Sequence, residues 1–119
     1  MATQPTPTVT HADVDRVVRR DFPADNSTSV FALLTEYGTE QWHRETDRVR
    51  LAALKLAAGD IVRLRAAIEM AKRDYRDILA AAEYPEYSQN VNPSEEMAED
   101  EMQRLIDSDW RQYSEWLAD

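Results

Sequence analysis

Apolar residues between Ile61 and Ala82 recur at alternating steps of three and four, which is the spacing of one face of an α-helix. The positions on this face are Ile61, Leu64, Ile68, Ala71, Tyr75, Ile78 and Ala82. A single amphipathic helix is marginal in water, so this face predicts burial against another helix. The preceding segment offers a matching set of apolar positions, namely Trp42, Val49, Ala53 and Leu56.

The two segments are separated by Gly59 and Asp60. Gly59 suits the left-handed conformation that follows a helix, and Asp60 suits the N-cap of the next helix. A loop this short makes the two helices antiparallel. We therefore predict a helical hairpin over residues 39–83, at the centre of the fold.

Shorter helical patterns flank the hairpin. One helix is expected over residues 12–22, a second over residues 30–37, and a last helix over residues 94–117. The first hairpin helix carries a second apolar patch that includes Leu51 and Leu54, which indicates that it lies between two neighbours. The helix at 30–37 is expected to pack on this patch.

No segment alternates apolar and polar residues as a strand does. The sequence therefore predicts an all-α fold, a small helical bundle without a sheet. Residues 10–119 are expected to form a single helical domain. Residues 1–9 are rich in proline and threonine, and we predict that they form a disordered tail.

Negative charge is concentrated at the carboxyl end of the chain. The formal net charge is −9, and the stretch from Ser94 to Asp119 holds nine acidic residues and two arginines, a net charge of −7. Residues 39–84 are close to neutral, with nine basic and eight acidic residues. The last helix and the hairpin are thus expected to attract each other, within one chain or between chains. Repulsion of phosphates by this net charge argues against nucleic acid as a partner.

Composition excludes several classes of chemistry. The chain has no cysteine, which rules out disulfides, thiol catalysis and cysteine zinc sites. Its two glycines are too few for the Gly-rich loops that bind phosphates or dinucleotides, and no cofactor is predicted. Residues 1–10 lack the features of a signal peptide, and no apolar run approaches the ~20 residues that span a membrane. We expect a cytoplasmic protein that has no membrane partner.

Three stretches carry a further pattern: DRVRLAALKL at 47–56, AKRDYRDIL at 71–79 and AEYPEY at 82–87. Together they resemble a family of small bacterial helical proteins that have no assigned function. The resemblance extends over about Leu34 to Tyr87. It implies a bacterial, cytosolic protein, and it brings no catalytic residues with it.

Glu40 and His43 have the Glu-x-x-His spacing of carboxylate-bridged di-metal bundles, in which a helix places both ligands on one face. Asp47 follows His43 by one helical turn. Such sites use two of these pairs, however, and the only other histidine is His11. Glu40, His43 and Asp47 are therefore weak metal candidates, and the alternative is a surface His–Asp pair or a partly buried histidine. No catalytic residue is predicted.

Asp109 falls within the apolar band of the last helix. A buried carboxylate costs several kcal/mol unless it is paired. We expect either an arginine partner from the hairpin, such as Arg48, or a frayed helical face that leaves Asp109 in water.

The predicted partner-binding residues are aromatic, because aromatic side chains are enriched at binding hot spots. They are Trp110, Tyr113, Trp116, Tyr84 and Tyr87. We predict a non-catalytic protein–protein interaction module that self-associates into a homo-oligomer. One alternative is an acidic regulator or inhibitor that binds a basic protein through the face from Glu95 to Glu101. Another is a small metal-dependent enzyme that uses Glu40 and His43.

Overall fold

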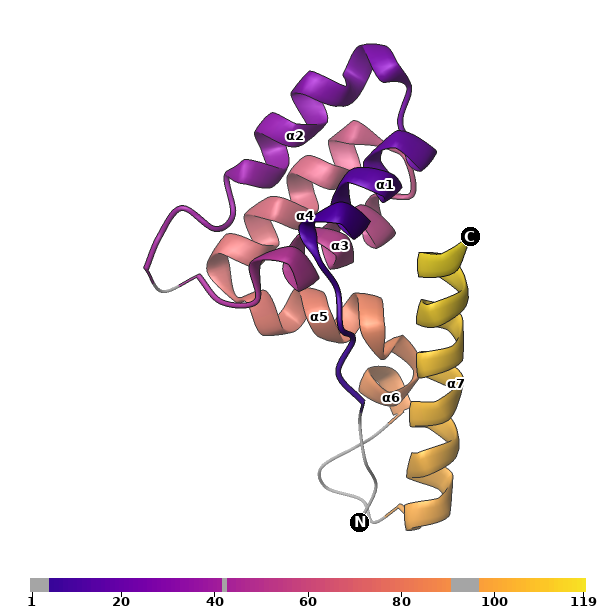
Figure 1. The fold of residues 1–119 in the computed structure, drawn as a ribbon. Helices are drawn as coiled ribbons and strands as arrows, with labels where there is room; N and C mark the ends of the chain where they lie inside the picture. The colour runs from indigo at the N-terminus through magenta and orange to yellow at the C-terminus, as the bar shows by residue number, and fades with distance from the viewer. Residues whose placement is uncertain (1–4, 42, 91–96) are drawn as a thin grey trace.

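The computed structural model describes residues 5–41, 43–90 and 97–119. Every regular element in these ranges is a helix, which confirms the predicted all-α class (Figure 1). The elements are α1 (His11–Asp21), a 3-10 turn (Ala24–Asn26), α2 (Ser27–Thr35), α3 (Thr46–Ala57), α4 (Ile61–Arg73), α5 (Tyr75–Glu83), α6 (Pro85–Asn90) and α7 (Glu99–Ala118).

Helix α3 lies at the centre of the bundle. It packs against α4 and α5, and α1 also contacts it, so that both of its apolar sides are covered. The side chains from Leu51 to Leu54 are fully buried. This confirms the predicted position of α3 between neighbours, because a helix that is apolar on two sides is stable in water only when both sides are buried.

The turn between α3 and α4 has the predicted chemistry. Asp60 caps α4, and its carboxylate accepts hydrogen bonds from the backbone N–H groups of Val62 at 2.8 Å and Arg63 at 3.3 Å. Gly59 has φ +83°, as a left-handed position requires. Ala58 is also left-handed, with φ +49°, which is unfavourable for a residue that carries a Cβ.

The first hairpin helix begins at Thr46, not at residue 39 as predicted. A loop precedes it, and the buried Tyr37 side chain holds this loop in place. The Tyr37 hydroxyl donates to the Arg44 carbonyl at 2.6 Å and accepts from the Arg44 N–H at 3.1 Å. These bonds, together with positive φ at Gly38 and Glu45, keep the segment out of a helix. Trp42 lies outside the described residues.

The predicted second helix is two helices, because α4 ends at Arg73 and α5 begins at Tyr75. Asp74 between them is extended (φ −157°), and its carboxylate accepts from the Arg76 N–H at 3.0 Å. A short side chain whose carboxylate accepts a hydrogen bond from a nearby backbone N–H competes with continuation of the helix. Helix α6 then starts at Pro85, which suits a first helical position because it needs no N–H there.

Helix α2 packs mainly on α4 and α1, and α1 takes the place on α3 that we had predicted for α2. Helix α1 begins with a capping box in which Thr10 and Asp13 bond each other's backbone groups. Within the described ranges, no helix has the length and apolar character needed to cross a membrane.

Helix α7 folds back onto its own chain, where it packs against α6 and α5. Its described start is Glu99, while the predicted start at residue 94 lies outside the described residues. Arg16 and Arg20 of α1 donate to the backbone carbonyls of Leu117 and Trp116, each at 2.6 Å. Cations at these carbonyls are favourable, because a helix carries partial negative charge at its carboxyl end.

Gly59→Ala and Ala58→Gly are expected to change stability in opposite directions. A Cβ on Gly59 would be strained at φ +83° and would lie 3.0 Å from the Asp21 carbonyl oxygen, so we expect a loss of about 1–2 kcal/mol. Removing the Cβ of Ala58 relieves strain and should stabilise the protein by up to about 1 kcal/mol. Urea denaturation measures both changes, and a loss of stability in Ala58→Gly would contradict the assignment of the turn.

Candidate functional site

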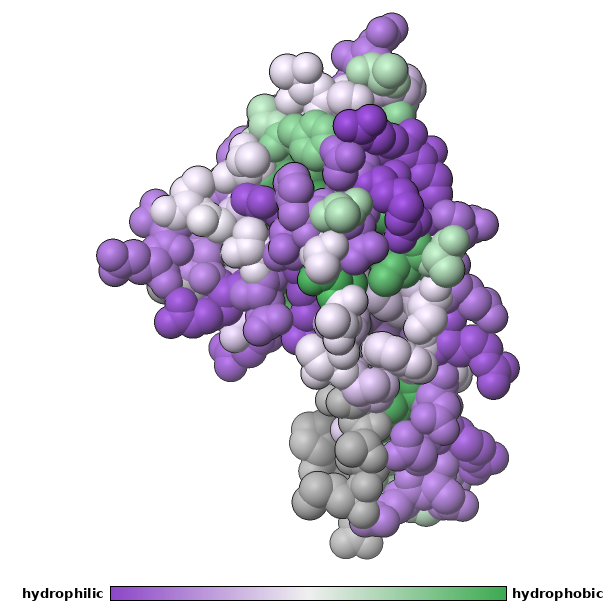
Figure 2. All heavy atoms as spheres, in the orientation of Figure 1, coloured by the Kyte–Doolittle hydropathy of each residue, from purple (hydrophilic) through white to green (hydrophobic). Residues whose placement is uncertain are grey.

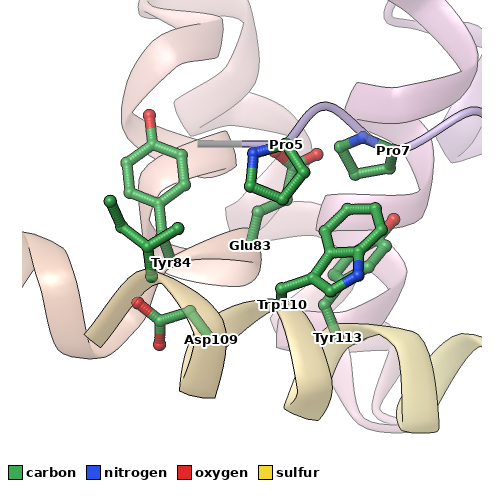
Figure 3. Close-up of a pocket in the computed structure, with 8 residues that line it drawn as sticks. Pro5, Pro7, Glu83, Tyr84, Asp109, Trp110 and Tyr113 are labelled. Carbon is green, nitrogen blue, oxygen red and sulfur yellow. The ribbon is translucent and has the colours of Figure 1, made fainter. Parts of the chain in front are cut away.

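Three of the five predicted partner-binding aromatics line one cleft. Tyr84 comes from the end of α5, and Trp110 and Tyr113 come from the middle of α7 (Figure 3). The remaining lining residues are Pro5, Pro7, Glu83, Ile106 and Asp109. The enclosed space is about 20 Å³, which is room for roughly one water molecule. Side chains therefore fill most of the cleft.

The aromatic side chains of the cleft differ in depth. Tyr113 is 1% exposed and forms the floor, whereas Trp110 is 38% exposed at the rim. Tyr113 therefore presents little free surface, and its predicted role in partner binding stays a prediction. Burial raises the pKa of the Tyr113 phenol above its usual value. Its hydroxyl is buried without a hydrogen-bond partner among the described residues, which costs about 1–3 kcal/mol.

Trp116 and Tyr87 lie outside this cleft. The guanidinium of Arg20 lies 5.2 Å from the centre of the Trp116 ring, a cation–π geometry that covers the half-buried indole. Tyr87 is half-buried and meets Tyr84 edge to face, with ring centres 6.2 Å apart. Their predicted role as partner-binding residues stays a prediction.

Glu83 forms one wall of the cleft and pairs with Arg48. Two parallel hydrogen bonds of 2.7 and 2.6 Å join the Arg48 guanidinium to the two carboxylate oxygens. The bonds to Glu83 raise the pKa of Arg48. The pair is well shielded, since the Glu83 side chain is 5% exposed, and it ties α3 to α5. Because Arg48 is used here, it is not the partner of Asp109.

Asp109 finds its partners in the backbone of α6 instead. Its carboxylate is buried, and it accepts hydrogen bonds from the N–H groups of Glu86 at 3.0 Å and Tyr87 at 2.9 Å. These N–H groups lie in the first turn of α6, where they have no partner within the helix. Asp109 is therefore an N-terminal cap that comes from another helix, and our predictions of an Arg48 pair or a wet carboxylate were both wrong.

The segment from Pro5 to Val9 covers the cleft. It is extended, and Pro5 and Pro7 lie over the aromatic side chains (Figure 3). Pro7 is buried, and Val9 packs against the core. Residues 1–4 of the predicted disordered tail lie outside the described residues, while residues 5–9 have a defined path. Sequence reasoning missed Pro7 because its burial depends on helices about 80 to 100 positions away.

The weak metal candidates do not share a helical face. Glu40 and His43 lie in the loop before α3, and Asp47 is in the first turn of α3. The Nδ1 atom of His43 accepts from the backbone N–H groups of Gly38 at 2.8 Å and Glu40 at 3.2 Å. The ring stacks on Tyr37, with centres 4.4 Å apart. His43 thus organises the loop, and no cluster of three or more metal-ligating side chains occurs in the described part of the chain.

Comparisons with protein-family models, with curated proteins and with solved structures find no match to this chain. The fold and the cleft therefore define the class by themselves. The protein is a small helical bundle with an aromatic cleft that one of its own extended segments covers.

Asp109→Ala is expected to destabilise the protein by about 2–3 kcal/mol, because two buried N–H groups of α6 lose a charged acceptor. Asp107→Ala is the matched control, since Asp107 is exposed on the same helix and should change stability by no more than about 0.5 kcal/mol. Chemical denaturation compares the two variants. Similar losses of stability in the two variants would show that the Asp109 cap contributes little to the free energy of unfolding.

Proposed function

We propose that the protein is a non-catalytic protein–protein interaction module and that the aromatic cleft between α5 and α7 binds another polypeptide. One observation carries the proposal. Tyr84, Trp110 and Tyr113 come together in a single cleft, and an extended segment with two prolines already lies over it. Aromatic-lined grooves are a recurring way of recognising extended proline-containing segments. A cytoplasmic location, expected from the sequence, is part of this proposal.

The polar groups of the cleft support a binding role over a catalytic one. General acid–base catalysis needs a group that can exchange a proton with a substrate. The Glu83 carboxylate is held by Arg48 through two hydrogen bonds, and Asp109 is held by two backbone N–H groups. Both carboxylates are thus engaged in structural contacts, and what the cleft offers a ligand is mainly aromatic surface.

The amino-terminal part of α7 favours a second candidate, the acidic regulator that binds a basic protein. Its first turns extend beyond α6 (Figure 1), and hydrophilic side chains gather along this part of the chain on the face that Figure 2 shows. Glu99, Asp100, Glu101 and Asp107 are all exposed there. A surface of this kind attracts a basic partner over a distance, and salt screens the attraction.

The first test is the solution mass of the full chain, because the sequence predicts that the partner is a second copy. We expect a mass above the 13.7 kDa of one chain at high concentration, and a return to that value in Trp110→Ala. Trp110 is more than one-third exposed, so its loss should spare the fold. A mass of one chain at every concentration would contradict self-association. Ser108→Ala, which is exposed and lies on the opposite side of α7 from Trp110, is the control.

The salt dependence of binding distinguishes the two candidate functions. Two copies with a net charge of −9 repel each other, so association through the aromatic surface of the cleft should hold or strengthen as salt rises from 50 to 500 mM. Binding of a basic protein through the acidic turns of α7 should weaken strongly over the same range. We expect polylysine to bind the protein at low salt only if the second candidate is correct. Exchange of Asp100 and Glu101 for lysine should then abolish this binding.

A further inference from the structure

The segment that covers the cleft shows which chemistry the cleft accepts. Pro5 and Pro7 lie over Trp110 and Tyr84 in an extended path (Figure 3), and Pro7 is buried there. A proline ring is compact and apolar, and its fixed φ angle lowers the entropy lost when an extended segment is bound. Residues 5–9 carry no charged side chain. The cleft thus fits an uncharged segment with the pattern Pro-x-Pro.

The segment is weakly attached. Within the described chain, residues 5–9 make no hydrogen bond to the helices, and their fixed contacts are those of Pro7 and Val9. Pro5, Thr6 and Thr8 are exposed. No backbone hydrogen bonds between the segment and the helices therefore have to break when the segment leaves the cleft. Another segment can therefore replace it at a cost limited to the apolar contacts of a few side chains.

The covering segment also leaves one group of the cleft unsatisfied. The Tyr113 hydroxyl is buried beside the cavity, and it has no hydrogen-bond partner among the described residues. The carbonyl groups of an extended proline-containing segment are not used in internal hydrogen bonds, so they are available as acceptors. A ligand that places a carbonyl oxygen at this hydroxyl gains a bond that the chain's own segment does not make. Such a differential contact is what allows a ligand to shift an equilibrium.

We propose that the cleft binds an extended, uncharged Pro-x-Pro segment of another protein, and that residues Pro5–Val9 are a built-in competitor that the partner displaces. The inference rests on the interaction role proposed above and names the ligand. A second copy that repeats the register of the chain's own segment leaves the Tyr113 hydroxyl unpaired, so we take a different protein as the occupant, and self-association is the alternative that the solution mass tests. The apparent affinity for the partner is then set by the fraction of molecules whose cleft is uncovered.

The test measures binding of two fluorescent peptides to the full chain by anisotropy. One peptide has the sequence MATQPTPTV of residues 1–9, and the other replaces both prolines with alanine. We expect the first peptide to bind the Pro5→Ala/Pro7→Ala protein about tenfold more tightly than the wild type, because the competitor is weakened. The alanine peptide should bind at least about tenfold more weakly. Adding Trp110→Ala to the double variant should abolish binding.

A third peptide tests the role of the hydroxyl. The repeat PTPTPTP can shift its register, so that one of its carbonyl groups faces Tyr113. We expect it to bind the wild type more tightly than MATQPTPTV does, and Tyr113→Phe should remove this advantage. The same substitution should leave the protein at least as stable as before, because it removes an unpaired buried hydroxyl. An unchanged preference in Tyr113→Phe would contradict the hydrogen bond.

The outcomes separate the ligand class from the interaction role. If no peptide binds the Pro5→Ala/Pro7→Ala protein, while Trp110→Ala still lowers the solution mass, then the ligand class is wrong and the interaction role stands. If Trp110→Ala changes neither the solution mass nor peptide binding, both proposals fall. If the wild type is an oligomer and the Pro5→Ala/Pro7→Ala protein is a monomer, the segment is exchanged between copies. That result would contradict the proposal of a separate proline-containing partner.

Discussion

The burial of α3 on both sides is the constraint on which the other helices depend. Four consecutive residues of this helix, from Leu51 to Leu54, are fully buried, so α1 has to cover one part of its surface while α4 and α5 cover another. The extended residues before α1 run from this helix to the cleft, where Pro5 and Pro7 lie beside Tyr84 and Trp110 (Figure 3). The covered cleft is thus a consequence of how the core is closed.

The sequence allowed the hairpin to be predicted because its signals are local. The three–four spacing, Gly59 and Asp60 act within one or two helical turns, and all of them are found in the structure. The break at Asp74 and the loop before α3 were missed because side-chain bonds to the backbone outweighed helix propensity there. The bonds of Asp109 to α6 and of Arg48 to Glu83 were beyond reach, because each joins residues that are 22 to 35 positions apart. The cleft depends on contacts more distant still, and the partner-binding role of its aromatic residues stays a prediction.

The buried polar groups around the cleft differ in whether they have hydrogen-bond partners, and this difference suggests different roles for them. Asp109 and Glu83 are fully engaged, and their bonds connect α7 to α6 and α5 to α3. Tyr113 lines the same cleft as these two carboxylates, and its hydroxyl has no hydrogen-bond partner among the described residues. A protein selected only for stability would gain from a phenylalanine at this position. In the proposed binding site, this unpaired donor is the group that distinguishes a ligand from the chain's own covering segment.

The intramolecular competition that we propose would make a small cleft selective. The chain's own segment is present at a high effective concentration, because it is tethered a few residues from the cleft. Ligands that match it only in apolar contacts gain nothing over it and are excluded. Ligands that also satisfy the Tyr113 hydroxyl have a contact that the tethered segment lacks, so the competition amplifies a single hydrogen bond into discrimination. Because the segment is attached only through the contacts of Pro7 and Val9, the free-energy cost of displacing it is small. In the proposed mechanism, the residues that cover the cleft therefore also set which polypeptides can displace them.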